Sequence, residues 1–306
     1  MRKSSLPESL RLNGVEIADT FAEAFLMKGT RVIVTAHNEK WAHIAAAEMA
    51  GNATSVIACD CETALEATLL PDESPDGRPG VSLLVFAFDR DSLAKAVQGR
   101  VGQCVLTTPT SACFNGVSDC PKDKKISVGG ALRYFGDGLQ FSKKLGNRRF
   151  WRIPTMDGEF LCEDTFGTVT GVGGGNLIIL GETQASALAS AEAAVEAVST
   201  VPDVILPFPG GIVRSGSKVG SKYPKLRAST NDAYCPTLRP LVESNLPENC
   251  QCVYELVIDG LSFDSVQAAM RVGINAATQV PGILRITAGN YGGKLGKHHF
   301  HLRELL

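Results

Sequence analysis

The chain has 306 residues, of which 44% are hydrophobic and 20% charged, a composition that excludes a disordered or fibrous protein. Thirty basic and 32 acidic residues give a formal charge of −2, so the overall positive charge typical of nucleic-acid-binding or membrane-surface proteins is absent. No apolar stretch reaches the roughly 18 residues of a membrane span, and residues 1–13 lack the apolar segment of a secretion signal. We therefore expect neither nucleic acid nor a membrane as a partner.

The nine cysteines include no Cys-x-x-Cys pair, and the histidines show no metal-ligand spacing. We predict no metal site. Most of the thiols are expected to be reduced and packed in the interior, as in a cytoplasmic protein.

The first half of the chain predicts strands on either side of a helix. Short apolar runs at residues 31–35, 55–58 and 81–88 are typical of buried strands. Between the first two runs, Asn38 is a suitable N-cap for a helix that ends at Gly51.

The second half also mixes helices and strands. The glycine-rich residues 171–176 are interpreted as a turn rather than a dinucleotide fingerprint, because no clear strand leads into them and a strand, not a helix, follows. Helices are predicted at residues 184–198 and after Ser262. Strands are predicted at residues 177–180, 204–206, 252–258 and 283–287.

Two strings recur at similar separations. Asp19-Thr20-Phe21 returns 145 positions later, and residues 144–150 are echoed 150 positions later by residues 294–300. Short matches also arise by chance. If the repeat is real, it predicts two similar lobes, residues 1–156 and 157–306. Interleaved helices and strands in each lobe then give an α+β fold, a two-lobed duplication of a ferredoxin-like βαββαβ sandwich.

Glu255 is out of place in its surroundings. It lies in the run 252–258, where both faces are mostly apolar, and its same-face neighbours are Val253 and Val257. Burial raises the pKa of a carboxyl group, and a neutral carboxylic acid can donate a proton at pH 7. A strand-edge glutamate that reaches solvent or pairs with a lysine is the structural alternative.

Residues 208–222 are rich in glycine, serine and basic residues, which suits a loop that holds an anion. They do not match the nucleotide P-loop, because Ser217 precedes Lys218 after Gly216. Residues 229–236 follow with many hydrogen-bonding side chains. A plain flexible surface loop is the alternative to a binding loop.

From Leu12 to Leu306 the chain resembles the formylmethanofuran:tetrahydromethanopterin formyltransferases. The strings that carry the resemblance are NGVEI (13–17), DTFAEAF (19–25), PDGRPGV (75–81), FPGGIV (208–213), SKVGSK (217–222), STNDAYCPT (229–237), MRVGINAA (270–277) and GGKLG (292–296). The resemblance implies the duplicated ferredoxin-like fold, dimers that assemble into a tetramer, and an active site in a cleft near the subunit interface.

The implied reaction is reversible transfer of a formyl group from formylmethanofuran, or the bacterial analogue formylmethylofuran, to N5 of tetrahydromethanopterin. No metal or tightly bound cofactor is implied. The resemblance places a buried catalytic carboxylic acid at Glu255. Both carriers are negatively charged, so we expect Ser217, Lys218, Ser221 and Lys222 to anchor them and Asn231, Asp232 and Tyr234 to line the cleft, although the resemblance does not assign individual contacts.

The near-balanced charge differs from the strongly acidic relatives of hot, salt-rich methanogens. It favours a methylotrophic bacterium, in which the protein would serve formaldehyde oxidation as a subunit of a formyltransferase/hydrolase complex. One alternative is a non-catalytic scaffold subunit of that complex. A nucleotide-binding α/β enzyme is disfavoured by the failed phosphate motifs.

Overall fold

The computed structural model describes residues 10–306, in which the chain forms two compact units. Unit 1 contains the N-terminal residues up to 26 together with 172–306, and unit 2 contains residues 27–171. The chain passes between the units within two long strands, β3 (Phe21–Thr35) and β12 (Val169–Gly181). The expectation that residues 1–13 carry no secretion signal falls largely outside the described residues.

This division differs from the predicted junction at residues 156 and 157. Those residues form the turn of a hairpin inside unit 2, between β9 (Arg148–Thr155) and β10 (Gly158–Glu163). Asp157 closes the turn by accepting a hydrogen bond from the Thr155 hydroxyl at 2.7 Å. The junction predicted from the repeat is therefore the turn of a hairpin and not a linker.

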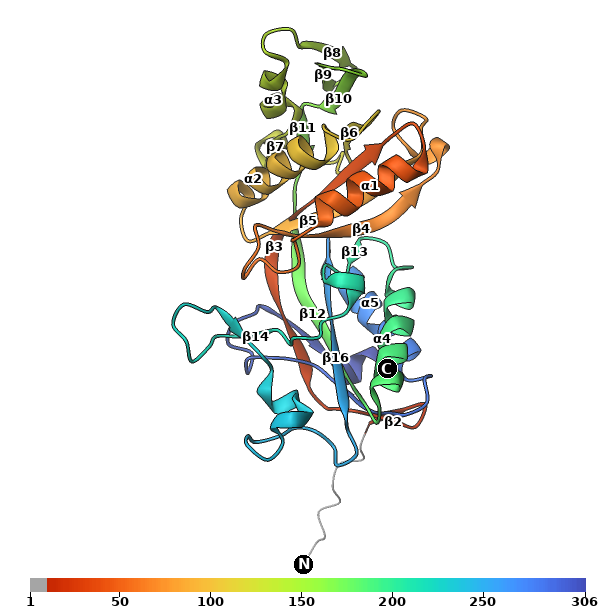
Figure 1. The fold of residues 1–306 in the computed structure, drawn as a ribbon, viewed down its shortest axis with the longest axis vertical. Coiled ribbons are helices and arrows are strands. Elements are labelled where there is room, and N and C mark those ends of the chain that lie inside the picture. The colour runs from red at the N-terminus through yellow and green to blue at the C-terminus, as the bar shows by residue number, and fades with distance from the viewer. Residues whose placement is uncertain (1–9) are drawn as a thin grey trace, which may run out of the picture. The chain divides into compact units, whose positions relative to one another are not determined.

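Unit 2 is built on six elements in the order βαββαβ (Figure 1). After β3 come α1 (Glu39–Ala50), β4 (Glu62–Leu69), β5 (Gly80–Ala87), α2 (Arg90–Arg100) and β6 (Ala112–Asn115). The four strands pair antiparallel in the order β4-β5-β3-β6. Both helices contribute to one apolar core with the strands, through residues such as Met49, Leu93 and Val97.

The remaining elements of unit 2 extend this sheet and add a small second one. A meander of β8 (Phe141–Leu145), β9 and β10 joins the sheet through β6, and α3 (Gly129–Leu132) precedes it. The second sheet pairs β7 (Lys125–Ser127) with β11 (Thr165–Gly167).

Unit 1 repeats the order of the six elements. They are β12, α4 (Gln184–Val198), β13 (Val204–Ile205), β16 (Cys252–Gly260), α5 (Phe263–Ala277) and β17 (Ile283–Thr287). The strands pair antiparallel in the order β13-β16-β12-β17, which matches the order in unit 2. Helices α4 and α5 pack against each other and share a core that includes Leu177, Ile179 and Met270 (Figure 1).

Three further strands join the sheet of unit 1. Strand β2 (Val15–Ile17) lies parallel to β17 and antiparallel to β1 (Arg11–Leu12), and β18 (His298–His301) pairs with the first residues of β3. Short 3₁₀ or π turns in the chain span Pro71–Glu73, Val101–Val105, Lys122–Lys124, Arg133–Gly136, Pro209–Gly211, Asp232–Tyr234, Pro236–Leu238 and Leu302–Leu305. No helix within residues 10–306 is long and apolar enough to cross a membrane.

The helix predictions are confirmed. The Asn38 side chain accepts the backbone N–H of Trp41 at the start of α1, residues 184–198 coincide with α4, and Ser262 caps α5. The predicted strands at residues 31–35, 81–88, 177–180, 204–206, 252–258 and 283–287 fall within or largely overlap β3, β5, β12, β13, β16 and β17.

Two local predictions are wrong. Residues 55–58 form a turn, because the Ser55 carbonyl accepts the N–H groups of Ala58 and Cys59 at 3.0 and 2.7 Å. Residues 171–176 are not a turn but part of β12, where a bulge between Val172 and Gly175 interrupts the pairing with β16. Glycines there signal an irregular strand.

The two echoes in the sequence also differ in structure. Asp19 and Asp164 each form a bend that leads into a strand. Residues 144–150, in contrast, belong to the β8–β9 hairpin, whereas most of 294–300 is irregular and enters β18 only at His298. The separation of 145 residues reappears between the starts of α1 and α4, at Glu39 and Gln184.

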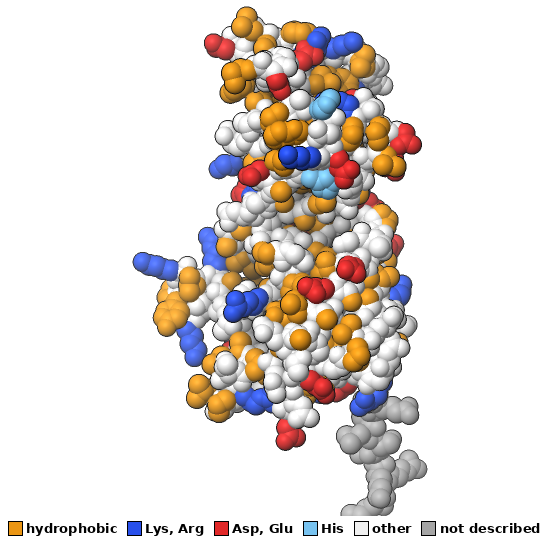
Figure 2. Space-filling view, turned by 45° about the vertical axis from the view of Figure 1, so that its right-hand side comes forward, with side chains coloured by type: hydrophobic (Ala, Val, Ile, Leu, Met, Phe, Trp, Pro, Cys, Tyr) orange, Lys and Arg blue, Asp and Glu red, His pale blue; other side chains and the backbone are white. Residues whose placement is uncertain are grey.

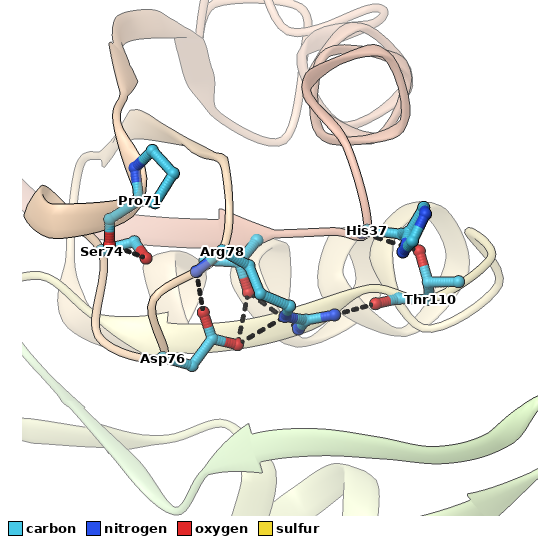
Figure 3. A network of polar contacts seen from close by, with 7 residues as sticks. His37, Pro71, Ser74, Asp76, Arg78 and Thr110 are labelled. Carbon is cyan, nitrogen blue, oxygen red and sulfur yellow. Dashed lines mark hydrogen bonds and ion pairs between the residues drawn. The ribbon is translucent and has the colours of Figure 1, made fainter.

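The units differ most in one connection. In unit 2, residues 70–79 join β4 to β5, and Arg78 ties them down by binding Asp76, Thr35 and the Thr110 carbonyl at 2.6–2.9 Å (Figure 3). In unit 1, residues 206–251 join β13 to β16 and include β14 (Lys218–Val219) and β15 (Ala228–Ser229). This segment, called here the insertion, covers the sheet face opposite α4 and α5, where Tyr234 packs with Ile178.

Candidate active site

The carboxyl group of Glu255 lies under the insertion. Glu255 sits within β16, opposite Ile178 of β12, and is 5% exposed. Its backbone exchanges two hydrogen bonds with Val213 of the insertion, at 2.7 and 3.1 Å. The side chain is thus enclosed between the sheet and the insertion, and does not extend into solvent from a strand edge.

Ser217 is the side-chain partner of Glu255. The Ser217 hydroxyl donates a hydrogen bond to Oε1 at 2.5 Å. Oε2 is buried and has no hydrogen-bond partner among residues 10–306. Burial raises the pKa of Glu255 to about 7, against the hydrogen bonds from Ser217, which lower it. Near neutral pH the group therefore both gives and accepts a proton readily.

A small cavity opens at Glu255. About 40 Å³ of it is open to the centre of a water-sized sphere, which is room for a small reacting group or a few water molecules. A side chain at Gly216, where φ is +75°, would come within 2.7 Å of Asn231, so glycine lets the loop close on that residue. The lining residues are Ile178, Val213, Arg214, Ser215, Gly216, Asn231, Tyr234, Cys235, Val253, Tyr254 and Glu255.

The structure brings some of the predicted site residues together. Ser217 contacts Glu255, and both Asn231 and Tyr234 line the cavity. Asp232 does not line it. Instead its carboxylate binds the Lys218 ammonium group at 2.6 Å, and this hydrogen bond holds the pKa of Asp232 below its usual range.

Ser221 and Lys222 lie outside the cavity lining. The Ser221 hydroxyl accepts the backbone N–H of Tyr223 at 3.0 Å, and Lys222 is exposed. They belong to residues 214–227, a span with five basic and no acidic side chains. Figure 2 shows Lys and Arg side chains gathered at the left of the lower half of the picture. Neither residue forms the wall of the cavity, and Lys222 is one of the five basic side chains of this span.

Tyr291 and Glu23 adjoin this site but were not predicted. The Tyr291 hydroxyl donates to the Ser217 carbonyl at 3.1 Å. Glu23 is 1% exposed and accepts the backbone N–H groups of Tyr291, Gly293, Leu295 and Gly296 at 2.6–2.9 Å. Burial would raise the pKa of Glu23, but these four donors together lower it. A carboxylate inside an apolar strand, the signal that marks Glu255, is also present in the sequence at Glu23.

The described residues contain no cluster of potential metal ligands. Within the described part of the chain, no three or more His, Cys, Asp or Glu side chains are grouped so that they could hold a metal ion. His299 and His301 both lie against the ring of Phe21.

Two family models match the chain over nearly its whole length. One, described as formylmethanofuran-tetrahydromethanopterin formyltransferase, matches residues 10–155. The other, described as the proximal lobe of the same family, matches residues 158–305.

Proteins with full-length similarity carry the same description. The formylmethanofuran–tetrahydromethanopterin formyltransferase of Methylococcus capsulatus is 59% identical over 298 residues, covering 96% of this chain and 99% of that protein. The formyltransferase of Methanosarcina barkeri has a similar structure, with a TM-score of 0.91, 46% identity, and 97% and 100% of the two chains covered.

A chain of the formyltransferase/hydrolase complex from Methylorubrum extorquens, solved with methylofuran, gives a TM-score of 0.94 at 54% identity and covers 98% of this chain and 99% of that one. Identity at this level over the full length, together with the two family models, establishes the relationship. The chain therefore belongs to the family of formylmethanofuran–tetrahydromethanopterin formyltransferases.

Proposed function

We propose that this formyltransferase moves a formyl group reversibly from formylmethanofuran, or from formylmethylofuran, to N5 of tetrahydromethanopterin at the cavity beside Glu255. The observation that carries the site is the Glu255 carboxyl group itself. It is 5% exposed, its pKa is raised to about 7, and its Oε2 has no partner among residues 10–306. Such a group is suited to manage protons during acyl transfer.

The reaction exchanges one carbon–nitrogen bond for another. N5 of the acceptor attacks the formyl carbon, and the carbonyl oxygen carries negative charge in the tetrahedral intermediate. The bond from the formyl carbon to the amine nitrogen of the furan carrier then breaks. N5 loses one proton and the leaving amine gains one, so no net proton is consumed.

Glu255 supplies and recovers that proton. In its neutral form it donates through Oε2 toward the oxyanion and then to the leaving amine, and its carboxylate later takes the proton from N5. Ser217 binds Oε1 at 2.5 Å, which leaves Oε2, without a partner among residues 10–306, as the oxygen that exchanges the proton. Holding the reacting atoms of the two carriers close together and correctly oriented accounts for much of the remaining rate enhancement.

The remaining site residues have supporting roles in this proposal. Asn231 and Tyr234 line the cavity and contact the reacting ends of the carriers. Lys218, Ser221 and Lys222 attract the negatively charged parts of the carriers, and Asp232 orients Lys218 through their ion pair. No metal or tightly bound cofactor takes part.

We also propose a history and an assembly for the chain. The matching strand orders β4-β5-β3-β6 and β13-β16-β12-β17 support a duplicated ferredoxin-like unit. The chain forms a dimer of dimers and joins a formyltransferase/hydrolase complex like that of the Methylorubrum extorquens relative. The cytoplasm suits its nine cysteines, all of which are free thiols.

An assay of the purified chain alone tests the activity. Formylmethylofuran or formylmethanofuran is mixed with tetrahydromethanopterin, and formation of the formylated pterin is followed by its absorbance. Turnover without any other subunit is the expected result. Binding of both carriers without turnover would instead identify a non-catalytic scaffold subunit.

A further inference from the structure

Glu23 of β3 anchors the loop at residues 291–296. Its Oε2 accepts the backbone N–H groups of Tyr291 and Gly293 at 2.6 and 2.9 Å. Its Oε1 accepts two further N–H groups of the loop, both at 2.6 Å. Burial would raise the pKa of Glu23, but the four donors together lower it, so the group stays a carboxylate and each bond is charge-assisted. One side chain thus holds most of the loop backbone.

The Tyr291 hydroxyl connects this loop to the site of Glu255. It donates a hydrogen bond to the Ser217 carbonyl at 3.1 Å. Burial raises the pKa of Tyr291, and the nearby N–H of Val219 lowers it. The negative charges of Glu255 and Glu23 raise this pKa further, so both carboxyl groups lie within electrostatic range of the phenol. The phenol therefore keeps its proton at neutral pH and remains a donor to the carbonyl.

Ser217 completes this series of contacts. Its hydroxyl donates to Oε1 of Glu255 at 2.5 Å. Burial raises the pKa of Glu255 to about 7, and the hydroxyl and the backbone N–H of Ser217 both act against that rise. Ser217 precedes β14 and lies outside any helix or strand, so its position depends on individual contacts such as the one with Tyr291.

We propose that Glu23 and Tyr291 are positioning residues, which fix the proton-exchanging carboxyl group through Ser217. Neither of the two lines the Glu255 cavity, so neither touches a carrier there. The inference rests on the proposed formyl transfer, in which that carboxyl group exchanges a proton at a defined place. Displacing a catalytic group by about 1 Å costs up to about 10²-fold in rate, so distant residues that hold it affect turnover.

Tyr291→Phe is the first test, because it removes only the hydroxyl and keeps the ring and the loop backbone. The pKa of Glu255 in the kcat/KM profile should move to higher pH, since a less firmly held Ser217 opposes the effect of burial less. The value of kcat should fall about threefold, as for the loss of one neutral hydrogen bond. The KM of each carrier should change less than about twofold, because no contact with a carrier is lost.

Glu23→Gln tests the other end of the series. A glutamine has the same size, but its amide nitrogen accepts no hydrogen bond, so two of the four loop N–H groups lose their acceptor. The profile should move in the same direction as in Tyr291→Phe, and kcat should fall about tenfold or more. If Glu23→Gln fails to fold, Tyr291→Phe decides alone.

A double variant shows whether Tyr291 acts through Ser217. Tyr291→Phe is added to Ser217→Ala, and the change in kcat and in the profile is compared with the change in wild type. If the hydroxyl of Ser217 transmits the effect, Tyr291→Phe should change both quantities much less in the Ser217→Ala background. Two full and independent effects would overturn the inference.

Glu163 of β10 provides the matched control in unit 2. It is also 5% exposed or less, accepts the Asn115 N–H at 3.0 Å and binds Arg148. Glu163→Gln should lose stability and yet keep the wild-type kcat and profile, and an equal displacement of the profile would show a general effect of losing a buried carboxylate. None of these variants changes the other titratable side chains that line the cavity, which are Arg214, Tyr234, Cys235 and Tyr254.

Chemical denaturation at several pH values adds a measurement that needs no turnover. The free energy of unfolding should fall with rising pH until folded Glu255 has lost its proton, and in Tyr291→Phe this fall should continue to higher pH. If the variant shows this displacement while wild type transfers no formyl group, the positioning role stands and the proposed activity is wrong. If wild type transfers formyl groups and Tyr291→Phe keeps the wild-type pH dependence, the positioning role is wrong and the activity stands.

Discussion

The two units place different side chains at one register position. In unit 2, Ile33 of β3 pairs with Ser82 of β5, and in unit 1, Ile178 of β12 pairs with Glu255 of β16. Ile33 and Ile178 are 145 residues apart, the separation of α1 and α4. The Ser82 hydroxyl donates to Glu66 at 2.6 Å, so its hydrogen bond is structural, whereas Glu255 leaves an oxygen without a partner.

The connections around these positions explain the difference. Arg78 fixes the short connection of unit 2 to Thr35 and Thr110. The insertion of unit 1 instead lies over Ile178 and Glu255 and leaves a cavity there. One sheet geometry thus supports packing in one unit and a reactive carboxyl group in the other, depending on a single side chain and on what covers it.

The largest effect is expected from removing the carboxyl group that distinguishes the units. Glu255→Gln should lower kcat by about 10³-fold while the fold persists, because a glutamine cannot give and retake the proton. Ser82→Ala is the matched control in unit 2. It should keep kcat near the wild-type value and lose about 1 kcal/mol of stability, because Glu66 loses one hydrogen bond. Steady-state kinetics and denaturant unfolding measure both, and near-normal turnover of Glu255→Gln would remove Glu255 from the mechanism.

The pH dependence of stability should also distinguish the two positions. The unfolded chain loses the Glu255 proton near pH 4.5, and the folded chain only near pH 7, so the free energy of unfolding should fall as pH rises between these values. This pKa difference corresponds to about 3 kcal/mol. Relative to wild type, Glu255→Gln should therefore gain about 3 kcal/mol between about pH 4 and pH 8.

Ser82→Ala provides the control for this titration, because a serine carries no proton that is lost in this range. Its unfolding free energy should run parallel to that of wild type across the same pH values. Chemical denaturation at several pH values gives the curves. Parallel curves for wild type and Glu255→Gln would show that Glu255 titrates at its ordinary pKa in the folded protein.

A smaller effect is expected from the hydrogen bond that holds Glu255. The Ser217 hydroxyl lowers the pKa of Glu255, so Ser217→Ala should move the corresponding pKa in the kcat/KM profile to higher pH and reduce kcat about tenfold. Ser221→Ala, in the same loop but outside the cavity lining, should leave the profile in place. An equal displacement in both variants would point to a general loosening of the loop.

The smallest effect is expected at the Lys218–Asp232 pair of the insertion, whereas the ion pair of the short connection in unit 2 joins Arg78 to Asp76. Lys218→Glu should raise the KM for a carrier several-fold and change kcat less, because surface charges mainly attract ligands. Asp232→Asn removes the ion pair but keeps the lysine, and its KM should change less. A kcat loss larger than the KM change in Lys218→Glu would contradict an anchoring role.

Local signals allowed much of the fold to be predicted. Asn38 and Ser262 cap helices through contacts within a few residues, and the apolar spacing of α4 and α5 is visible in the sequence. The strand predicted at residues 55–58 is wrong because a short apolar run also fits a turn. The strand that follows, β4, was not predicted, because many of its side chains are at least partly exposed and it lacks a continuous apolar run.

The site could be predicted from the sequence where a charged residue lies among apolar neighbours. Glu255 did so within an apolar run. Tyr291 could not be found this way, because its contact with Ser217 joins residues 74 positions apart. The pairing of Lys218 with Asp232 likewise depends on the β14–β15 ribbon, which a glycine-rich sequence does not specify.

The loop around Glu23 has a consequence for how this protein can evolve. Glu23 is bound by backbone N–H groups, which every residue except proline supplies. Side chains of the loop do not form these bonds, but the loop needs glycine at Gly293, where φ is +72°, and at Gly296, where a side chain would meet the Ala24 carbonyl at 2.4 Å. A single change at residue 23, in contrast, would release the backbone of Tyr291, 268 positions away. Mutational sensitivity for this loop thus extends to a residue near the opposite end of the chain.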